Sequence, residues 1–351
     1  MFRRYRQRLA PAACAPIVFR WDLDKTYLKT EFDSLRELVR LPFEKAQDKI
    51  AVPGVVPLIR GLREAAVHAG REVRIYFISA SPPQIAKAIR QKLALDGIEY
   101  DGIVFKDQLG HLVRGRFRDL REHVGFKLTE LLSSRQTLPA AAIEVLFGDD
   151  WESDPIIYSL YADIVAGRVE DEELADALRA LEVAPALIAG MRELAHKVAR
   201  ADAVVKIYIN LERRMPLTSF RIFGPRLVPT FNYLQTAACL LQDGYLPLAG
   251  VGQVAERLIS ESAYTSAAVI NSLADITRRG HLQPRSAAAI RAHLRARGLV
   301  QLERRSRLVA AWSRLIRWID PRPRPVSSPP ELIDYPQLVT QWQAARLEER
   351  R

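Results

Sequence analysis

The alternation of short apolar segments with longer helical segments constrains the fold of this chain more than any other feature. Five segments are predicted to be β-strands because β-branched and aromatic residues dominate them: 16–21, 73–78, 102–105, 143–147 and 203–210. Segments with helical periodicity or helix-start signals follow them, namely 55–69, 81–95, 119–134, a helix starting near 154, and 228–242. Strands that alternate with helices predict an α/β fold with a parallel sheet covered on both faces.

Polar side chains follow three of these predicted strands directly. Asp22 and Asp24 come after the first strand, Ser79 after the second, and Asp149 with Asp150 after the fourth. The carboxyl ends of parallel strands meet at one edge of the sheet, which is where ligands bind in open α/β folds. The sequence therefore predicts one functional site at this edge.

The aspartates of the segment Asp22-Leu-Asp-Lys-Thr26 suit phosphoryl transfer. A carboxylate can attack phosphorus and form an aspartyl-phosphate, and we predict this role for Asp22. Asp24 would protonate the leaving oxygen and then activate a water molecule. Thr26 would brace the loop by hydrogen bonding and help to bind the phosphate.

The same aspartates suggest a magnesium site. Mg²⁺ prefers carboxylate oxygens together with several waters, and we expect Asp22 and Asp149 to hold it, with Asp24 in the same group. Asp150 or Asp154 would orient a metal-bound water, and the sequence leaves open which of the two supports the metal.

Phosphate binding requires positive charge and hydrogen-bond donors. Ser79 and Ser81 precede a predicted helix, whose first N–H groups favour an anion. Lys127, within the helix before the fourth strand, could pair with the phosphate and offset its repulsion by Asp22. Lys106 is the rival candidate for this role.

The order of these motifs resembles that of the haloacid-dehalogenase-like (HAD) phosphatases. Their signature is a hydrophobic strand with Asp-x-Asp-x-Thr, a strand ending in Ser, a Lys, and then Gly-Asp-Asp-x-x-x-Asp. The matching residues lie within about 16–165: Asp22, Asp24, Thr26, Ser79, Lys127, Asp149, Asp150 and Asp154. The resemblance implies a HAD-type Rossmannoid core and an Mg²⁺-dependent phosphoric monoester hydrolase. Residues 31–50 could supply one helix over the site, which would be a minimal cap.

A narrower resemblance links the chain to the catalytic domain of actin-patch-associated phosphatidate phosphatases. It rests on Phe77-Ile-Ser-Ala-Ser-Pro-Pro-Gln84, on Gly148-Asp-Asp-Trp-Glu-Ser-Asp-Pro-Ile-Ile-Tyr158 and on the strand Val204-Val-Lys-Ile-Tyr-Ile209. This resemblance implies a phosphatidate-like lipid as substrate, or another bulky phosphomonoester.

The C-terminal part differs from the rest in charge. The chain has 351 residues and a net charge of +11, and residues 278–324 alone contain thirteen arginines against two acids, Glu303 and Asp320. We expect a helical C-terminal extension on the α/β core. The predicted organisation is a core over 1–165, a helical insertion over 166–200, the last strand and helix of the core over 201–245, a basic helical extension over 246–319 and a proline-rich tail over 320–351.

The predicted helix 304–319 places Leu308, Trp312, Leu315 and Ile319 on one face and arginines off it. A helix of this kind could dock on its own domain, lie on an anionic membrane surface or contact nucleic acid. Docking fits best and nucleic acid is the unlikely case, because no nucleic-acid motif supports it.

The resulting hypothesis is an Mg²⁺-dependent phosphatase that forms an aspartyl-phosphate. The alternative is a catalytically silent basic adaptor that binds an anionic membrane or nucleic acid. Two cysteines, no secretory signal and no long apolar run predict a cytoplasmic protein that could also bind a membrane peripherally.

Overall fold

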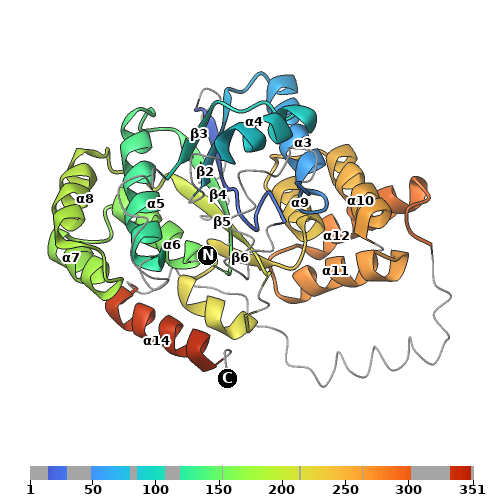
Figure 1. Cartoon of the computed structure of the whole chain (residues 1–351). Helices are drawn as coiled ribbons and strands as arrows, with labels where there is room; N and C mark the ends of the chain where they lie inside the picture. Colours follow the sequence, from blue (N-terminus) through green and yellow to red (C-terminus); the bar gives the residue numbers. More distant parts are fainter. Residues whose placement is uncertain are drawn as a thin grey trace. The chain divides into compact units, whose positions relative to one another are not determined.

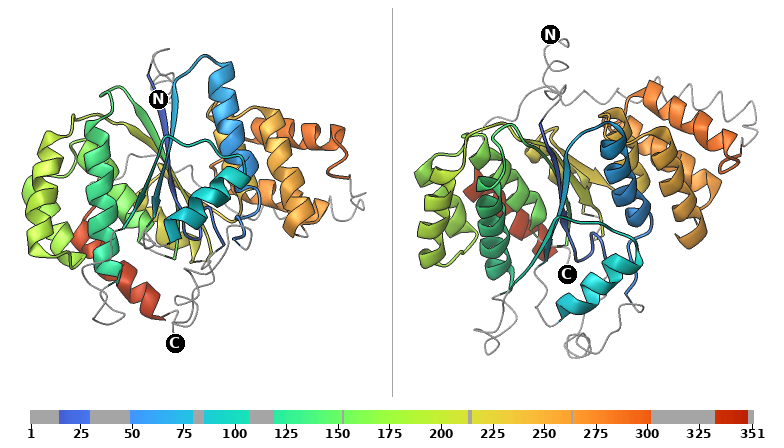
Figure 2. Two further views of the ribbon diagram at one scale, coloured as in Figure 1. Left: turned by 45° about the horizontal axis from the view of Figure 1, so that its top comes forward. Right: turned by 90° about the horizontal axis from the view of Figure 1, so that it is seen from above.

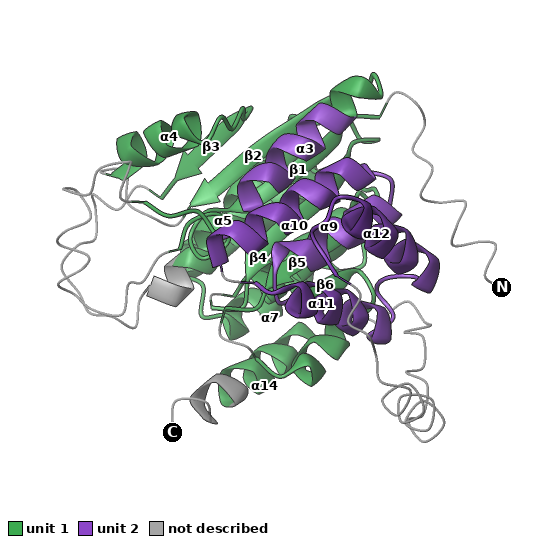
Figure 3. Cartoon of the chain, turned by 90° about the vertical axis from the view of Figure 1, so that its right-hand side faces the viewer, with its two compact units in different colours: residues 1–52, 66–229, 330–351 green, residues 53–65, 230–329 purple. Residues whose placement is uncertain are grey.

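The computed structural model describes residues 15–29, 49–79, 85–106, 119–151, 153–212, 215–262, 264–301 and 333–348. It divides the chain into two compact units: unit 1 comprises residues 1–52, 66–229 and 330–351, and unit 2 comprises residues 53–65 and 230–329 (Figure 3). The predicted helices 31–50 and 304–319 lie outside the described residues except at Lys49 and Ile50, and so does Ser81.

A six-stranded sheet forms the centre of unit 1 (Figure 1). Its order is β3-β2-β1-β4-β5-β6. The strands are β1 (Ile17–Asp22), β2 (Val73–Ser79), β3 (Gly102–Phe105), β4 (Ile143–Asp149), β5 (Val204–Asn210) and β6 (Leu227–Thr230). The pairs β1–β2, β1–β4, β2–β3 and β4–β5 are all parallel. The predicted α/β fold with a parallel sheet is therefore confirmed.

Strand β1 lies between β2 and β4, and all six of its residues are buried. A strand covered on both faces is expected to be a nearly continuous apolar run, as this segment is. The parallel register aligns the strand ends, because Asp22 lies opposite Ile78 and Trp21 lies opposite Phe147. Residues that follow β1, β2 and β4 are therefore brought to one edge.

Four helices of unit 1 lie together on one face of the sheet (Figure 2). They are α5 (Asp119–Gln136), α6 (Asp154–Val165), α7 (Asp171–Ala180) and α8 (Pro185–Lys197). Their apolar side chains join Leu146, Ile207 and Ile209 of the strands in one buried cluster. Helices α7 and α8 occupy the segment 166–200, and a capping box between Glu170 and Glu173 starts α7. Unit 1 also contains α4 (Ala86–Leu95) and the 3₁₀ helix η4 (Leu217–Phe223).

A C-terminal helix, α14 (Tyr335–Glu348), also belongs to unit 1. The sequence predicts a proline-rich tail over 320–351, and this prediction is wrong for the residues of α14. Trp342 is buried and packs edge-on against Phe220 and Phe223, with ring centroids 5.7 Å apart in both pairs. At the start of the helix, the Tyr335 hydroxyl donates to Asp163 Oδ2 at 2.5 Å. The chain therefore returns to unit 1 after completing unit 2.

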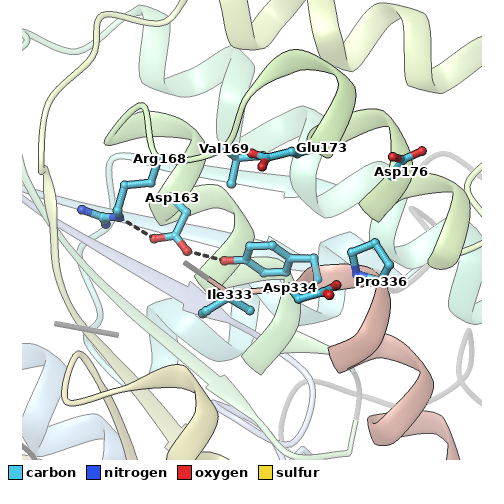
Figure 4. A pocket seen from close by; sticks show the side chains of 9 residues that line it. Asp163, Arg168, Val169, Glu173, Asp176, Ile333, Asp334 and Pro336 are labelled. Atoms are coloured by element: carbon cyan, nitrogen blue, oxygen red, sulfur yellow. Dashed lines mark hydrogen bonds and ion pairs between the residues drawn. The ribbon is translucent and has the colours of Figure 1, made fainter. Parts of the chain in front are cut away.

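A pocket of about 280 Å³ lies where this C-terminal segment meets α6 and α7 (Figure 4). Asp163 lines it and accepts from Arg168 Nε at 2.9 Å and from Arg226 Nη2 at 2.5 Å, besides the bond from Tyr335. Burial raises the pKa of Tyr335 well above its ordinary value, and Asp163 adds to this shift. The phenol therefore remains a neutral donor to the carboxylate.

Unit 2 is helical. It contains most of α3 (Val55–His68), together with α9 (Tyr233–Gln242), α10 (Leu248–Ser262), α11 (Ser266–Arg278) and α12 (Pro284–Ala296). Side chains cap two of these helices: Asn232 Oδ1 accepts from Gln235 N, and Thr265 Oγ1 accepts from Ala268 N. Helices α10, α11 and α12 occupy part of the predicted extension over 246–319. Among the described residues, no helix combines the length and apolar character needed to cross a membrane.

Candidate active site

The four central strands of unit 1 each end in a polar side chain that is buried. Asp22 ends β1, Ser79 ends β2, Asp149 ends β4 and Asn210 ends β5. Burying polar groups is unfavourable unless they are hydrogen-bonded or paired. Four such residues at one sheet edge therefore indicate a site with a specific chemical task.

Lys127 lies at the centre of this site. It is fully buried on α5, and its Nζ lies 2.7 Å from Asp22 Oδ1 and 2.6 Å from Asp154 Oδ1. One ammonium group thus bridges the end of β1 and the start of α6. The role of Lys127 in phosphate binding stays a prediction, and its contact with Asp22 places it next to the predicted nucleophile.

Lys106, the rival candidate, follows β3 and is also buried. Its backbone N–H donates to the Ser79 carbonyl oxygen at 3.1 Å. Both lysines are therefore close to strand ends, and Lys127 is the one that lies between Asp22 and Asp154.

Three carboxylates form a compact group suited to a metal ion. Asp22, Asp149 and Asp154 are buried, and one oxygen from each lies within 4.8 Å of the others. The backbone N–H of Asp149 donates to Asp154 Oδ2 at 3.3 Å, which ties the start of α6 to the end of β4. The predicted ligands Asp24 and Asp150 are not in this group.

Gly148 allows the close approach of α6 to β4. A Cβ atom at this position would lie 2.4 Å from Asp154 Oδ2 and 2.8 Å from Tyr158 Cε2. Both neighbours are buried, so neither can move into solvent. Only glycine therefore fits at this position while Asp154 stays in the group.

The loop after β1 is a tight turn. Lys25 has φ +59°, its N–H donates to Leu28 O at 2.8 Å, and Tyr27 N donates to Leu23 O at 2.9 Å. Thr26 is fully buried within this turn. The Lys25 ammonium lies 3.2 Å from the centroid of the Trp151 ring, a cation–π contact between the loops that follow β1 and β4.

Asp24 projects from this turn and is half-buried. Ser79 Oγ donates to Asp24 Oδ2 at 3.3 Å, so the predicted acid and the predicted phosphate-binding serine are neighbours. Partial exposure lets Asp24 exchange protons with solvent, which a general acid and base requires.

Asp150 is fully buried, and its Oδ2 accepts from Met215 N at 3.1 Å. This carboxylate therefore anchors the chain that follows β5, whereas Asp154 contacts Lys127. The geometry favours Asp154 over Asp150 as the partner of the metal group.

Asn210 and Tyr158 were missed as site residues by the sequence analysis. Asn210 Nδ2 donates to the Lys25 carbonyl oxygen at 3.3 Å and to Glu212 Oε1 at 2.7 Å, so it holds the turn after β1. Its position at the end of a predicted strand was the available signal. Burial raises the pKa of Tyr158 far above its ordinary value, and the carboxylates of Asp154 and Asp22 reinforce this, so the phenol stays neutral beside the acidic group.

The arrangement combines a buried lysine, clustered carboxylates and a half-buried second aspartate on an α/β sheet. Residues 21–171 match the family model "Phosphatidate phosphatase APP1, catalytic domain". The matched segment is similar to a phosphatase catalytic domain. The match includes Asp22, Asp24, Lys127, Asp149 and Asp154, and it confirms the resemblance inferred from the motifs. It spans less than half of the 351 residues and contains none of the last 180. No curated protein and no solved structure matches the chain.

Proposed function

We propose that unit 1 is an Mg²⁺-dependent phosphatase that acts through an aspartyl-phosphate on Asp22. The observation that carries this proposal is the buried group of Asp22, Asp149 and Asp154 around Lys127. The match to the phosphatidate phosphatase family supports the reaction class.

The charges of the site fit a divalent cation. With all groups ionised, three buried carboxylates and one buried ammonium leave two negative charges in a low-dielectric environment. Buried charge is costly unless it is compensated, and a divalent cation would balance it. Asp22, Asp149 and Asp154 present only oxygen atoms, the ligands that Mg²⁺ prefers. A bound Mg²⁺ would neutralise phosphate charge during the reaction.

The residues of the chain can complete the reaction in two steps. In the first, an Asp22 oxygen attacks phosphorus, the bond from phosphorus to the leaving oxygen breaks, and Asp24 donates its proton to that oxygen. In the second, Asp24 takes a proton from water, which attacks the aspartyl-phosphate. Inorganic phosphate leaves, and both Asp22 and protonated Asp24 are restored.

Lys127 and Ser79 would orient these groups. Lys127 fixes the Asp22 carboxylate by its 2.7 Å contact and could attract the phosphate by charge. Ser79 holds Asp24 through its 3.3 Å bond and precedes the segment that leads into α4.

The substrate we propose is a phosphatidate-like lipid or another bulky phosphomonoester. Support comes from the family match, whose description names phosphatidate. A panel of phosphatidate, sugar phosphates, nucleotides and phosphopeptides would identify the preferred class by phosphate release.

Substitution of the nucleophile tests the proposal directly. We expect Asp22→Asn to lower the turnover of an aryl phosphate by about 10⁴-fold or more, because no aspartyl-phosphate can form. The matched control is Asp176→Asn, which changes an exposed aspartate on α7 that pairs with Arg179 and should leave turnover unchanged. Circular dichroism would check that both variants are folded, and chelation of Mg²⁺ should reduce the wild type to the level of Asp22→Asn. Equal turnover by Asp22→Asn and wild type would overturn the mechanism. No turnover of any panel member by the wild type with Mg²⁺ would favour the silent adaptor.

A further inference from the structure

Unit 2 contains two helices joined by a short braced turn. Helix α11 ends at Arg278, Gly280 has φ +85°, and α12 starts at Pro284. Glycine tolerates this left-handed conformation, which other residues rarely adopt. Leu282 of the turn is buried, so the turn is anchored to the helical core.

Helix α9 holds this turn in place. Gln242 Nε2 donates to the His281 carbonyl oxygen at 3.1 Å, and Gln242 Oε1 accepts from Gln283 N at 2.6 Å. One side of α12 is buried, and it carries Ala287, Ile290 and Leu294. The orientation of α12 within unit 2 is therefore fixed by both its turn and its buried side.

The outward side of α12 is small and basic. Its exposed residues are Pro284, Arg285, Ala288, Ala289, Ala292, Arg295 and Ala296, and half-buried Arg291 flanks them. Among the described residues, Arg285, Arg291 and Arg295 form no ion pair.

Other arginines of unit 2 already neutralise the nearby acids. Asp275 pairs with Arg278 and Arg279, at 3.0 and 2.9 Å, and Glu256 pairs with Arg297 at 2.7 Å. Within the part of unit 2 that the structure describes, the arginines on the outward side of α12 therefore keep their charge available for an external anion. Guanidinium groups bind phosphate oxygens with two parallel hydrogen bonds.

We propose that this face of α12 binds double-stranded DNA. A helix-turn-helix places its second helix in the major groove, and four exposed alanines let the α12 backbone approach closely while arginines reach the phosphates. A helix that lies in a membrane interface instead buries large apolar side chains, and the exposed side of α12 has none. The deep, narrow major groove of RNA duplexes does not admit such a helix. The fold thus favours nucleic acid as the partner of α12, whereas the sequence pattern made nucleic acid the unlikely partner of the predicted helix 304–319.

The test uses the full chain and a fluorescent duplex of about 20 base pairs, two helical turns, of random sequence. We expect Arg285→Ala/Arg295→Ala to weaken binding about ten-fold at low salt and to reduce the slope of log affinity against log salt by about 1.8. The control is Arg60→Ala/Arg221→Ala, which removes two exposed arginines from α3 and η4 and should bind like wild type. All three proteins would also be mixed with vesicles containing an anionic phospholipid.

Three outcomes would overturn the proposal. The first is that the wild type does not bind the duplex at low salt. The second is that both double variants weaken duplex binding equally. The third is that the wild type binds anionic vesicles but not the duplex, and that only Arg285→Ala/Arg295→Ala loses the vesicle binding. Unchanged phosphatase activity in Arg285→Ala/Arg295→Ala would separate this surface from the proposed reaction at Asp22.

Discussion

At the scale of single residues, the site depends on a balance of buried charge and on the lack of a side chain at Gly148. Lys127 can be buried because Asp22 and Asp154 lie at 2.7 and 2.6 Å from its Nζ. Asp154 reaches this position because Gly148 leaves room for it. Gly148 takes no part in the proposed reaction, yet the position of Asp154 depends on it.

Gly148→Ala tests this dependence. The added methyl group would collide with Asp154 Oδ2 and Tyr158, so Asp154 should shift away from Lys127 and from the metal group. We expect turnover and metal affinity to fall about 10- to 100-fold, as when a residue supporting a metal ligand is changed, and stability to fall about 1–3 kcal/mol. Steady-state kinetics against Mg²⁺ concentration measures the first effect and thermal unfolding the second.

The matched control is Gly190→Ala on α8. A Cβ atom there meets nothing within 4 Å, and alanine favours a helix interior, so this variant should be as active as wild type and no less stable. Wild-type activity and metal affinity in Gly148→Ala would show that Asp154 does not need its present position.

At the scale of elements, a second buried polar cluster holds together four of the elements that carry the site. Glu144 of β4 is paired with Arg20 of β1, lies 3.3 Å from Arg135 of α5, and accepts from the Tyr161 hydroxyl of α6 at 2.8 Å. The same elements carry Asp149, Asp22, Lys127 and Asp154 of the site. Lys127 and Arg135 are two helical turns apart, as are Asp154 and Tyr161. The cluster therefore fixes the relative positions of β1, β4, α5 and α6 through residues that are not themselves part of the candidate active site.

Removal of the Glu144 charge tests the cluster. Burial opposes the charge on Arg20, yet Glu144 raises its pKa above the ordinary value, so Arg20 stays ionised at neutral pH. Glu144→Gln would leave the arginines buried without a counter-charge, and we expect a loss of about 3–5 kcal/mol in the free energy of unfolding.

Tyr161→Phe is the comparison for this prediction, because it removes one hydrogen bond to the same carboxylate and keeps the charge pairs. Its cost should be smaller, about 1–3 kcal/mol. Urea unfolding measures the free energy of unfolding of both variants. If Glu144→Gln lost no more of this free energy than Tyr161→Phe, the role given to the Glu144 charge would be contradicted.

At the scale of the whole molecule, unit 1 is discontinuous in sequence. Residues 53–65 and 230–329 form unit 2, and the chain returns to unit 1 for α14. Trp342, Leu338 and Val339 of α14 are buried in the same cluster as α6 and η4. The last segment is therefore part of the folded core that carries the site.

Trp342→Ala tests whether α14 stabilises unit 1. Loss of the indole leaves a cavity between Phe220 and Phe223, and we expect a cost of about 3–5 kcal/mol. Gln343→Ala changes the exposed neighbour on the same helix and should alter stability by less than about 0.5 kcal/mol. Chemical denaturation of the full chain measures both values, and equal stabilities would show that α14 contributes little to the unit.

The sequence by itself determined the elements of the core and the chemical candidates. Strands β1 to β5 lie close to the predicted ranges, because alternating apolar patterns and turn residues act locally. Strand β6 was not predicted: the helix expected over 228–242 begins only at Tyr233, and Leu227–Thr230 instead joins the edge of the sheet. Asp22, Asp149, Asp154 and Lys127 could also be named in advance, since parallel strands must bring their ends to one edge.

Only the tertiary structure decided how these residues meet. It placed Lys127 between Asp22 and Asp154, turned Asp150 toward Met215, and added Asn210 beneath the loop after β1. It also packed α14 into unit 1 and held α12 with its arginines outward. These contacts join residues far apart in the chain, and they depend on packing and on buried charge, which no local pattern encodes.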